Sequence, residues 1–144
     1  LIDHINGNTI CEADHLFATR LWQNNSKVHF DINAREDKKR LIYGGHIISL
    51  VRALSFNGLE NAQLIVGING GTHANPAFAE DTIYCWSEVL EKIDLNVRNI
   101  AALRLRSVGT KEKNHSMKVK SDDGRYLPTT VLDFDYWVLV PREL

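Results

Sequence analysis

A histidine in a polar loop offers the clearest chemistry in this sequence. His29 lies in the stretch 24–31, which begins with Asn24 and ends with Asp31. A histidine can exchange a proton near neutral pH. An asparagine can orient a water molecule but cannot act as a base. A histidine in such a loop can equally be a hydrogen-bonded packing residue, so the residues alone leave both interpretations open.

A pair of glycines, Gly44 and Gly45, opens the most apolar part of the chain. The spacing of the residues that follow predicts a buried helix that ends before Gly58: Ile47, Ile48, Leu50, Val51 and Leu54. Free N–H groups at a helix N-terminus can bind negative charge. With the loop 24–31 folded over this end, a proton carrier would lie beside an oxyanion site, which suits addition or removal of water next to a thioester carbonyl. The alternative is a flexible turn into a buried helix.

Four further residues are weaker candidates. His46 and His73 each lie next to glycines, where a histidine can line a ligand channel or simply pack half-buried. Arg104 and Arg106 share one face of an expected strand and could bind phosphates or carboxylates. They could instead make ordinary cross-strand pairs with acidic residues: Asp133, Asp135, Glu88 and Glu91.

Composition excludes several classes of partner. The chain has 144 residues, a formal net charge of −1 and no long basic run, so we expect no nucleic-acid partner. It shows no apolar run of membrane-spanning length and no signal peptide, and we expect a cytoplasmic protein. The two cysteines, Cys11 and Cys85, are expected to be buried free thiols. The six histidines (residues 4, 15, 29, 46, 73 and 115) lack ligand spacing, so we expect no metal site.

Periodicity predicts two helices followed by a run of strands. A turn at Asn6-Gly7-Asn8 and a capping box at Thr9 and Glu12 introduce a helix over about 10–22. Its buried stripe would be Ile10, Ala13, Phe17 and Leu21, with Asp14, His15 and Arg20 toward the other side. The central helix follows from Gly44. Alternating apolar residues predict strands over 63–68, 82–90, 101–108 and 131–140, with 70–76 also extended.

One buried helix with strands and no βαβ alternation indicates an α+β fold. A curved antiparallel sheet wrapped around the central helix, the hot-dog arrangement, satisfies the pattern. Exposed sheet edges usually pair, so we expect a second unit as partner. The chain begins at Leu1 within an apparent strand, and we expect residues 1–144 to be one hot-dog domain of a longer polypeptide.

Several blocks of sequence together resemble a known family. They include Thr19-Arg-Leu-Trp-Gln-Asn24, Lys27-Val-His-Phe-Asp31, Arg40-Leu-Ile-Tyr-Gly-Gly-His46, Arg52-Ala-Leu-Ser-Phe-Asn-Gly58, His73-Ala-Asn-Pro76 and Leu132-Asp-Phe-Asp-Tyr-Trp137. The chain resembles the mesaconyl-CoA hydratases, also called β-methylmalyl-CoA dehydratases, among the MaoC-like hot-dog hydratases. The likeness extends over nearly the whole chain and is to the C-terminal half of enzymes that carry two hot-dog units.

The resemblance implies a function. It implies reversible hydration of a short branched enoyl-CoA thioester, mesaconyl-CoA to β-methylmalyl-CoA, with an acyl-CoA substrate and no metal or redox cofactor. It also implies that the second unit is the N-terminal half of the same polypeptide or a second copy. Two alternatives remain: an acyl-CoA thioesterase of hot-dog fold, and a non-catalytic half that completes a partner's CoA site.

The family's Asp-x-Asn-Pro-x-His motif maps onto this chain only in part. Its histidine falls on His29 and its aspartate on Asn24, while the glycine at the helix start falls on Gly44. Asn24 cannot be a base, so either His29 alone carries the proton with Asn24 orienting water, or Asp31 substitutes, or this half is degenerate. We favour the first account.

Substrate-binding residues are the last expectation. Gly45, His46 and His73 are expected to contact the substrate, because all three lie close to the helix start or beside glycines. Arg52 and Arg104 are candidates for the substrate's free carboxylate.

Overall fold

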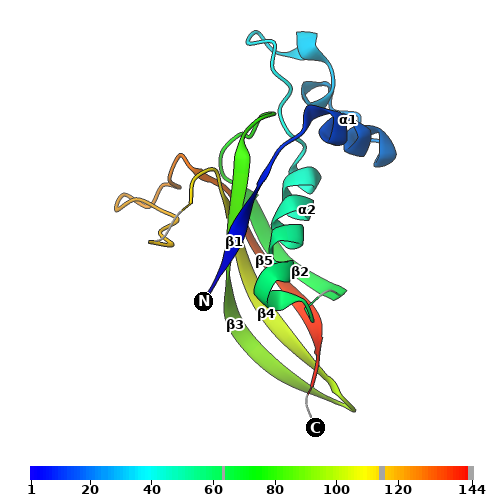
Figure 1. The fold of residues 1–144 in the computed structure, drawn as a ribbon, viewed down its shortest axis with the longest axis vertical. Coiled ribbons are helices and arrows are strands. Elements are labelled where there is room, and N and C mark those ends of the chain that lie inside the picture. Colours follow the sequence, from blue (N-terminus) through cyan, green and yellow to red (C-terminus); the bar gives the residue numbers. More distant parts are fainter. Residues whose placement is uncertain (63, 114–115, 143–144) are drawn as a thin grey trace.

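A five-stranded antiparallel sheet forms the body of the molecule. The computed structural model describes residues 1–62, 64–113 and 116–142. The strands are β1 (Ile2–Thr9), β2 (Leu64–His73), β3 (Thr82–Val97), β4 (Ile100–Thr110) and β5 (Thr130–Pro141). They lie in the order β1-β3-β4-β5-β2, so β1 and β2 are the edges. Figure 1 shows the sheet curving with helix α2 (Gly44–Leu54) on one face and the segment between β4 and β5 on the other.

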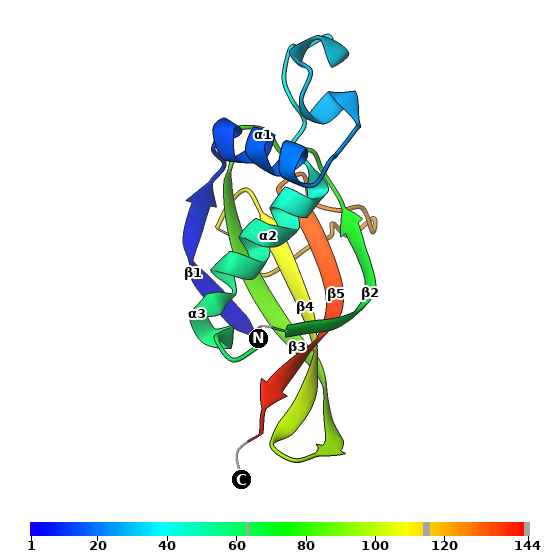
Figure 2. The same cartoon turned by 90° about the vertical axis from the view of Figure 1, so that its right-hand side faces the viewer.

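The α+β hot-dog expectation is confirmed by this arrangement. Helix α2 lies across the concave face of the sheet (Figure 2). The predicted strands are all present, though β3 and β4 are longer than expected and form a hairpin that extends beyond α2. On β5, alternation places four side chains in the core, as the pattern predicted: Leu132, Phe134, Tyr136 and Val138.

Helix α2 begins at Gly44, as its sequence predicts, and ends at Leu54, three residues short of the expected end at Asn57-Gly58. Ile47 and Val51 are buried against the sheet, while Ser49 and Ala53 on the other side are exposed. A short turn, α3 (Phe56–Leu59), follows, and Gly58 has φ +94°, a conformation that glycine adopts without strain. The sheet therefore covers one side of α2 and leaves the other open.

Helix α1 (Glu12–Leu21) does not bury its predicted apolar stripe, and of the residues predicted on its polar side only His15 points inward. His15 and Thr19 are the buried residues, whereas Phe17 and Leu21 are 61% and 59% exposed. The expected face was therefore wrong, because the inner side of α1 meets backbone polar groups at the start of α2 rather than an apolar core. The predicted capping box is also absent: Cys11 is the N-cap, and Thr9 lies in β1 and bonds to Thr82.

Three smaller expectations need correction or lie outside the described residues. Residues 6–8 are not a turn but part of β1, which pairs with β3 through an irregularity between His4 and Gly7. Cys11 is exposed rather than buried, while Cys85 is buried and free, and burial raises the pKa of its thiol to about 12. Residue 63 of the predicted strand 63–68 and residue 115 of the histidine set lie outside the described residues.

A chain of hydrogen bonds crosses the core under α2. His4 bonds to the Asn57 carbonyl (2.6 Å) and to Ser87 Oγ (2.8 Å). Ser87 Oγ then bonds to Ser107 Oγ (2.8 Å), and Ser107 Oγ bonds to Tyr136 Oη (2.9 Å). Arg52 Nη1 donates to Tyr136 Oη (2.9 Å).

The two ends of this chain fix its direction. A carbonyl can only accept, so His4 Nδ1 carries the proton and Nε2 accepts from Ser87. A guanidinium can only donate, so the Tyr136 hydroxyl accepts from Arg52 and donates to Ser107 Oγ. The Ser107 hydroxyl in turn donates to Ser87 Oγ. Burial lowers the pKa of His4, which favours the neutral ring that this pattern requires.

Candidate active site at the start of α2

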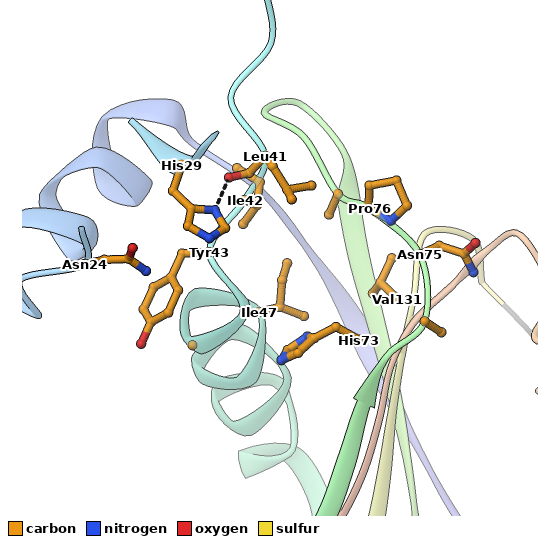
Figure 3. Close-up of a pocket in the computed structure, with 14 residues that line it drawn as sticks. Asn24, His29, Leu41, Ile42, Tyr43, Ile47, His73, Asn75, Pro76 and Val131 are labelled. Carbon is orange, nitrogen blue, oxygen red and sulfur yellow. Dashed lines mark hydrogen bonds between the residues drawn. The ribbon is translucent and has the colours of Figure 1, made fainter. Parts of the chain in front are cut away.

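A cavity of about 520 Å³ lies at the N-terminal end of α2. Its lining includes five of the residues expected from the sequence: Asn24, His29, Gly44, Gly45 and His73. Figure 3 shows His29 above the first turn of α2, with Asn24 and Tyr43 on one side and His73 beside the helix on the other. The remaining wall is largely apolar, from residues 41–43, Ile47, 74–77 and Val131.

One hydrogen bond sets the tautomer of the neutral His29 ring. This half-buried residue ends a 3-10 turn, Lys27–His29, and its Nδ1 lies 2.8 Å from the Leu41 carbonyl oxygen. Because a carbonyl only accepts, Nδ1 carries the proton and the lone pair is on Nε2. Figure 3 shows that this second nitrogen points toward Tyr43 and the start of α2. His29 therefore presents a base to the cavity in its neutral form.

Asn24 faces the same cavity with a hydrogen-bond donor. Its Oδ1 accepts from the Ser26 backbone N–H at 2.9 Å, a local turn typical of asparagine and aspartate. That bond fixes the amide, so its NH₂ group points toward Tyr43 and the cavity (Figure 3). An NH₂ group can hold the oxygen of a water molecule but cannot take its proton.

The first turn of α2 supplies two unused donors. The Tyr43 carbonyl accepts from the N–H groups of His46 (2.9 Å) and Ile47 (3.3 Å). Within the part of the chain that the structure describes, the N–H groups of Gly44 and Gly45 have no such partner. They lie where the helix dipole is positive, and both residues line the cavity, so they can bind an oxyanion.

Side chains lie close against both glycines. A Cβ at Gly44 would lie 2.5 Å from His73 Nε2, and one at Gly45 would lie 2.5 Å from Tyr43 Cζ. The His73 ring thus rests directly on the start of the helix. Its surroundings lower its pKa by desolvation, which favours the neutral ring.

Three candidates from the sequence, His46, Arg52 and Arg104, lie elsewhere. His46 lines a neighbouring cavity of about 270 Å³ with the side chains of Phe17, Leu21 and Trp22. Arg52 donates to Tyr136 and to the Ala62 carbonyl, and so belongs to the core. None of the three lines the cavity at His29.

Arg104 is the third of these candidates, and it faces away from α2. Leu103 and Leu105, which flank it on β4, pack in the core beneath the helix, so alternation turns Arg104 to the opposite face. There it makes two hydrogen bonds to Asp135, of 2.9 and 2.6 Å. Arg106 is paired with Asp133 in the same way. Cross-strand pairing therefore accounts for both arginines.

Asp31, the alternative carboxylate, does not line the cavity either. Its Oδ1 accepts from Asn33 N at 2.8 Å and caps the short 3-10 helix Ile32–Ala34. Among the described residues that line the cavity at His29, none is an aspartate or glutamate. The only proton carriers on the described wall are therefore His29, His73 and Tyr43.

Sequence reasoning missed two residues of this region, His15 and Tyr43. His15 is fully buried on α1, and its Nε2 accepts from the Tyr43 backbone N–H at 2.9 Å. Tyr43 is the N-cap of α2 and lines the cavity. The bond joins residues 28 positions apart, so no local pattern in the sequence could have indicated it.

Neither a metal-binding cluster nor a membrane-spanning helix occurs among the described residues. They contain no cluster of three or more histidine, cysteine, aspartate or glutamate residues placed to hold a metal ion. They contain no helix with the length and hydropathy needed to cross a membrane.

Solved structures identify the fold as that of MaoC-like hot-dog proteins. A MaoC domain protein from Chloroflexus aurantiacus superposes with a TM-score of 0.94 and is 51% identical, covering 99% of this chain and 42% of that one. A Mycobacterium tuberculosis protein described as having a double hot-dog fold gives a TM-score of 0.64 at 21% identity, covering 93% and 36% of the two chains. No protein-family model matches the chain.

Two curated relatives are also similar over nearly the whole chain. Mesaconyl-CoA hydratase from Cereibacter sphaeroides is 57% identical over 141 residues, which are 98% of this chain and 41% of the relative. β-Methylmalyl-CoA dehydratase from Chloroflexus aurantiacus is 53% identical over 146 residues, with 98% and 42% covered. The chain is therefore a homologue of one part of these enzymes, as the resemblance predicted, and it spans about two fifths of their length.

Proposed function

We propose that this chain carries an active site for the reversible hydration of a short branched enoyl-CoA thioester, with mesaconyl-CoA as the substrate and β-methylmalyl-CoA as the product. The observation that carries the proposal is the His29–Leu41 hydrogen bond. It leaves a basic Nε2 facing a cavity that also holds the free N–H groups of Gly44 and Gly45. The names of the two curated relatives supply the substrate.

The proposed reaction needs one base and one oxyanion site. His29 Nε2 takes a proton from water while the water oxygen bonds to Cβ of the enoyl group. The electron pair of the double bond moves toward the thioester, and the N–H groups of Gly44 and Gly45 bind the resulting enolate oxygen. The imidazolium then gives its proton to Cα. Dehydration runs through the same steps in reverse.

Asn24 orients the water in this proposal. Its Oδ1 is engaged by Ser26, so its NH₂ can hold the water oxygen on the side away from His29. The thioester itself activates Cβ, so the reaction needs no metal or redox group.

We infer that a second hot-dog unit covers the open side of α2. The relatives are more than twice the length of this chain, which leaves room for one. Apolar side chains on α1, at its C-cap and on the edge strand β2 are exposed in the described chain: Phe17, Leu21, Trp22, Leu64, Val66 and Ile68. A surface of this kind is typical of a protein interface. The second unit is the place to look for a group that binds the substrate's free carboxylate, since Arg52 and Arg104 are engaged elsewhere.

A thioesterase is less well supported. Such an enzyme would need a carboxylate to direct water at the carbonyl carbon, and no described residue lining the cavity supplies one. The products distinguish the two reactions, because a thioesterase releases free CoA and a hydratase keeps the thioester intact.

The test is turnover of mesaconyl-CoA by the full natural polypeptide that contains this chain, with products identified by mass spectrometry. His29→Ala should lower kcat by roughly 10²- to 10⁴-fold, the range for loss of a general base. Lys27→Ala, in the same 3-10 turn with an exposed side chain, is the matched control. Unchanged turnover in His29→Ala would exclude this catalytic role, and release of free CoA by the wild type would indicate the thioesterase.

A further inference from the structure

The segment that leads into α2 is held at three consecutive backbone positions. Leu41 N donates to the Val28 carbonyl, Ile42 N to the Ala77 carbonyl and Tyr43 N to His15 Nε2, each at 2.9 Å. The first two bonds are between backbone groups. The third is made by a side chain, so it alone can be removed by substitution without changing the backbone.

His15 is suited to this bond only in one chemical state. Its Nε2 accepts, so the ring must be neutral with its proton on Nδ1. Burial, together with the nearby His46 and His29, lowers the pKa of His15 to about 4. The ring is therefore a permanent acceptor at neutral pH. Its Nδ1 is buried, and the described residues offer it no hydrogen-bond partner. A buried donor without a partner lowers the stability of the fold at this position.

Tyr43 connects this bond to both halves of the site. Its carbonyl receives the first hydrogen bonds of α2, and the next two residues carry the free N–H groups. Its ring lies against Gly45 and 5.9 Å from the His29 ring, in an edge-on arrangement. A shift of Tyr43 would therefore move the oxyanion donors and the support of the base together.

We propose that His15 is a positioning residue, which fixes the Tyr43 backbone and thereby aims the Gly44 and Gly45 N–H groups into the cavity. The chain's own geometry carries the anchoring step, while the catalytic consequence rests on the proposed hydratase function. His15 does not line the cavity, so it acts through Tyr43 and not on the substrate.

Three variants of α1 separate this role from general support of the helix. His15→Phe fills the site but removes the acceptor. His15→Gln places an amide oxygen near the position of Nε2 and can accept from Tyr43 N. Thr19→Val is the matched control, because Thr19 is buried one turn further along the same face and its hydroxyl bonds only within α1, to the Leu16 carbonyl.

The first measurement is made on the full polypeptide without any ligand, by NMR of ¹⁵N-labelled tyrosine and glycine amides. In His15→Phe we expect the Tyr43, Gly44 and Gly45 signals to shift and the Tyr43 N–H to exchange at least tenfold faster. Those signals should stay near wild type in His15→Gln and Thr19→Val. Unmoved signals in His15→Phe would overturn the anchoring role whether or not the protein is a hydratase.

The second measurement is steady-state turnover of mesaconyl-CoA. We expect His15→Phe to lower kcat about 10- to 100-fold, with KM changed less than about threefold and the pH profile unshifted, because the base is still His29. His15→Gln should recover most of the loss. Equal losses in His15→Gln and His15→Phe would indicate a purely structural role and overturn the proposal.

Two outcomes need a separate measurement. If His15→Phe does not fold, the long-range ¹H–¹⁵N spectrum of the wild-type imidazole decides, since a proton on Nε2 would contradict the bond to Tyr43. If the wild type itself does not hydrate mesaconyl-CoA, the hydratase function fails, and the NMR result still decides the anchoring.

Discussion

Cutting the buried hydrogen-bond chain in its middle should cost far more stability than cutting a similar bond at the surface. Ser107→Ala removes two bonds at once, of 2.8 Å to Ser87 and 2.9 Å to Tyr136. A typical buried hydrogen bond contributes about 1 kcal/mol, and a buried hydroxyl left without a partner costs about 1–3 kcal/mol. Because Tyr136 is fully buried and loses its acceptor, we expect a loss of about 2–3 kcal/mol in the free energy of unfolding.

The Ser107→Ala/Tyr136→Phe double variant tests whether the buried hydrogen bonds act as a unit. Tyr136→Phe should also cost about 2–3 kcal/mol, since it removes the donor to Ser107 and an acceptor of Arg52. The Ser107–Tyr136 bond is lost in both single variants, so the double variant should be less destabilised than the sum by about 1 kcal/mol.

Urea unfolding, followed by circular dichroism and tryptophan fluorescence, measures these differences. Thr9→Val is the control, because it removes a hydroxyl–hydroxyl bond of the same 2.8 Å length that is exposed to solvent. It should change the free energy of unfolding by less than about 0.5 kcal/mol. A Ser107→Ala variant as stable as the control, or strictly additive losses in the double variant, would refute the cooperative chain.

Two further predictions concern the site. Gly44→Ala would place a Cβ 2.5 Å from His73 Nε2, so we expect this exposed ring to be displaced. The value of kcat/KM for mesaconyl-CoA should then fall roughly 10- to 100-fold, while the free energy of unfolding stays within about 1 kcal/mol of wild type. An unaltered kcat/KM would contradict the contact. His15 binds a proton more readily in the unfolded chain than in the folded one, where its pKa is about 4. The free energy of unfolding therefore has its full value above pH 6.5 and loses about 3 kcal/mol as the pH falls toward 4. Urea unfolding at a series of pH values should show a smaller decline in His15→Gln than in wild type, and identical slopes would show that His15 is not held neutral.

The sequence predicted the body of the fold because its signals there are local and strong. The apolar run after Gly44 predicts a buried helix, which is α2. The alternation on β5 agrees with the burial of Leu132 and Phe134. The pairing of His29 with the start of α2 could also be anticipated, because a polar loop and a glycine pair lie close in sequence.

What could not be predicted depends on contacts between distant residues. A hydrophobic stripe predicts the inner face of a helix only when that face meets apolar groups, and on α1 the inner face meets the Tyr43 N–H through His15. Arg52 is a candidate for the substrate's carboxylate by residue type alone, but in the structure it donates to Tyr136, 84 residues away. For Arg104 the sequence also predicted a structural alternative, a cross-strand pair with an acidic residue, and the structure contains that pair.

The three anchored amides at residues 41–43 also determine which part of the molecule must stay closed for the cavity to exist. Their partners are Val28, Ala77 and His15, all in segments around the N-terminal end of α2 rather than in the strands of the sheet. Opening of these segments would dismantle the cavity while the strand ladders remain paired. The ability to bind a ligand is thus governed by the free energy of this local opening, which can be much smaller than that of global unfolding. Amide hydrogen exchange at Leu41, Ile42 and Tyr43 reports that equilibrium directly.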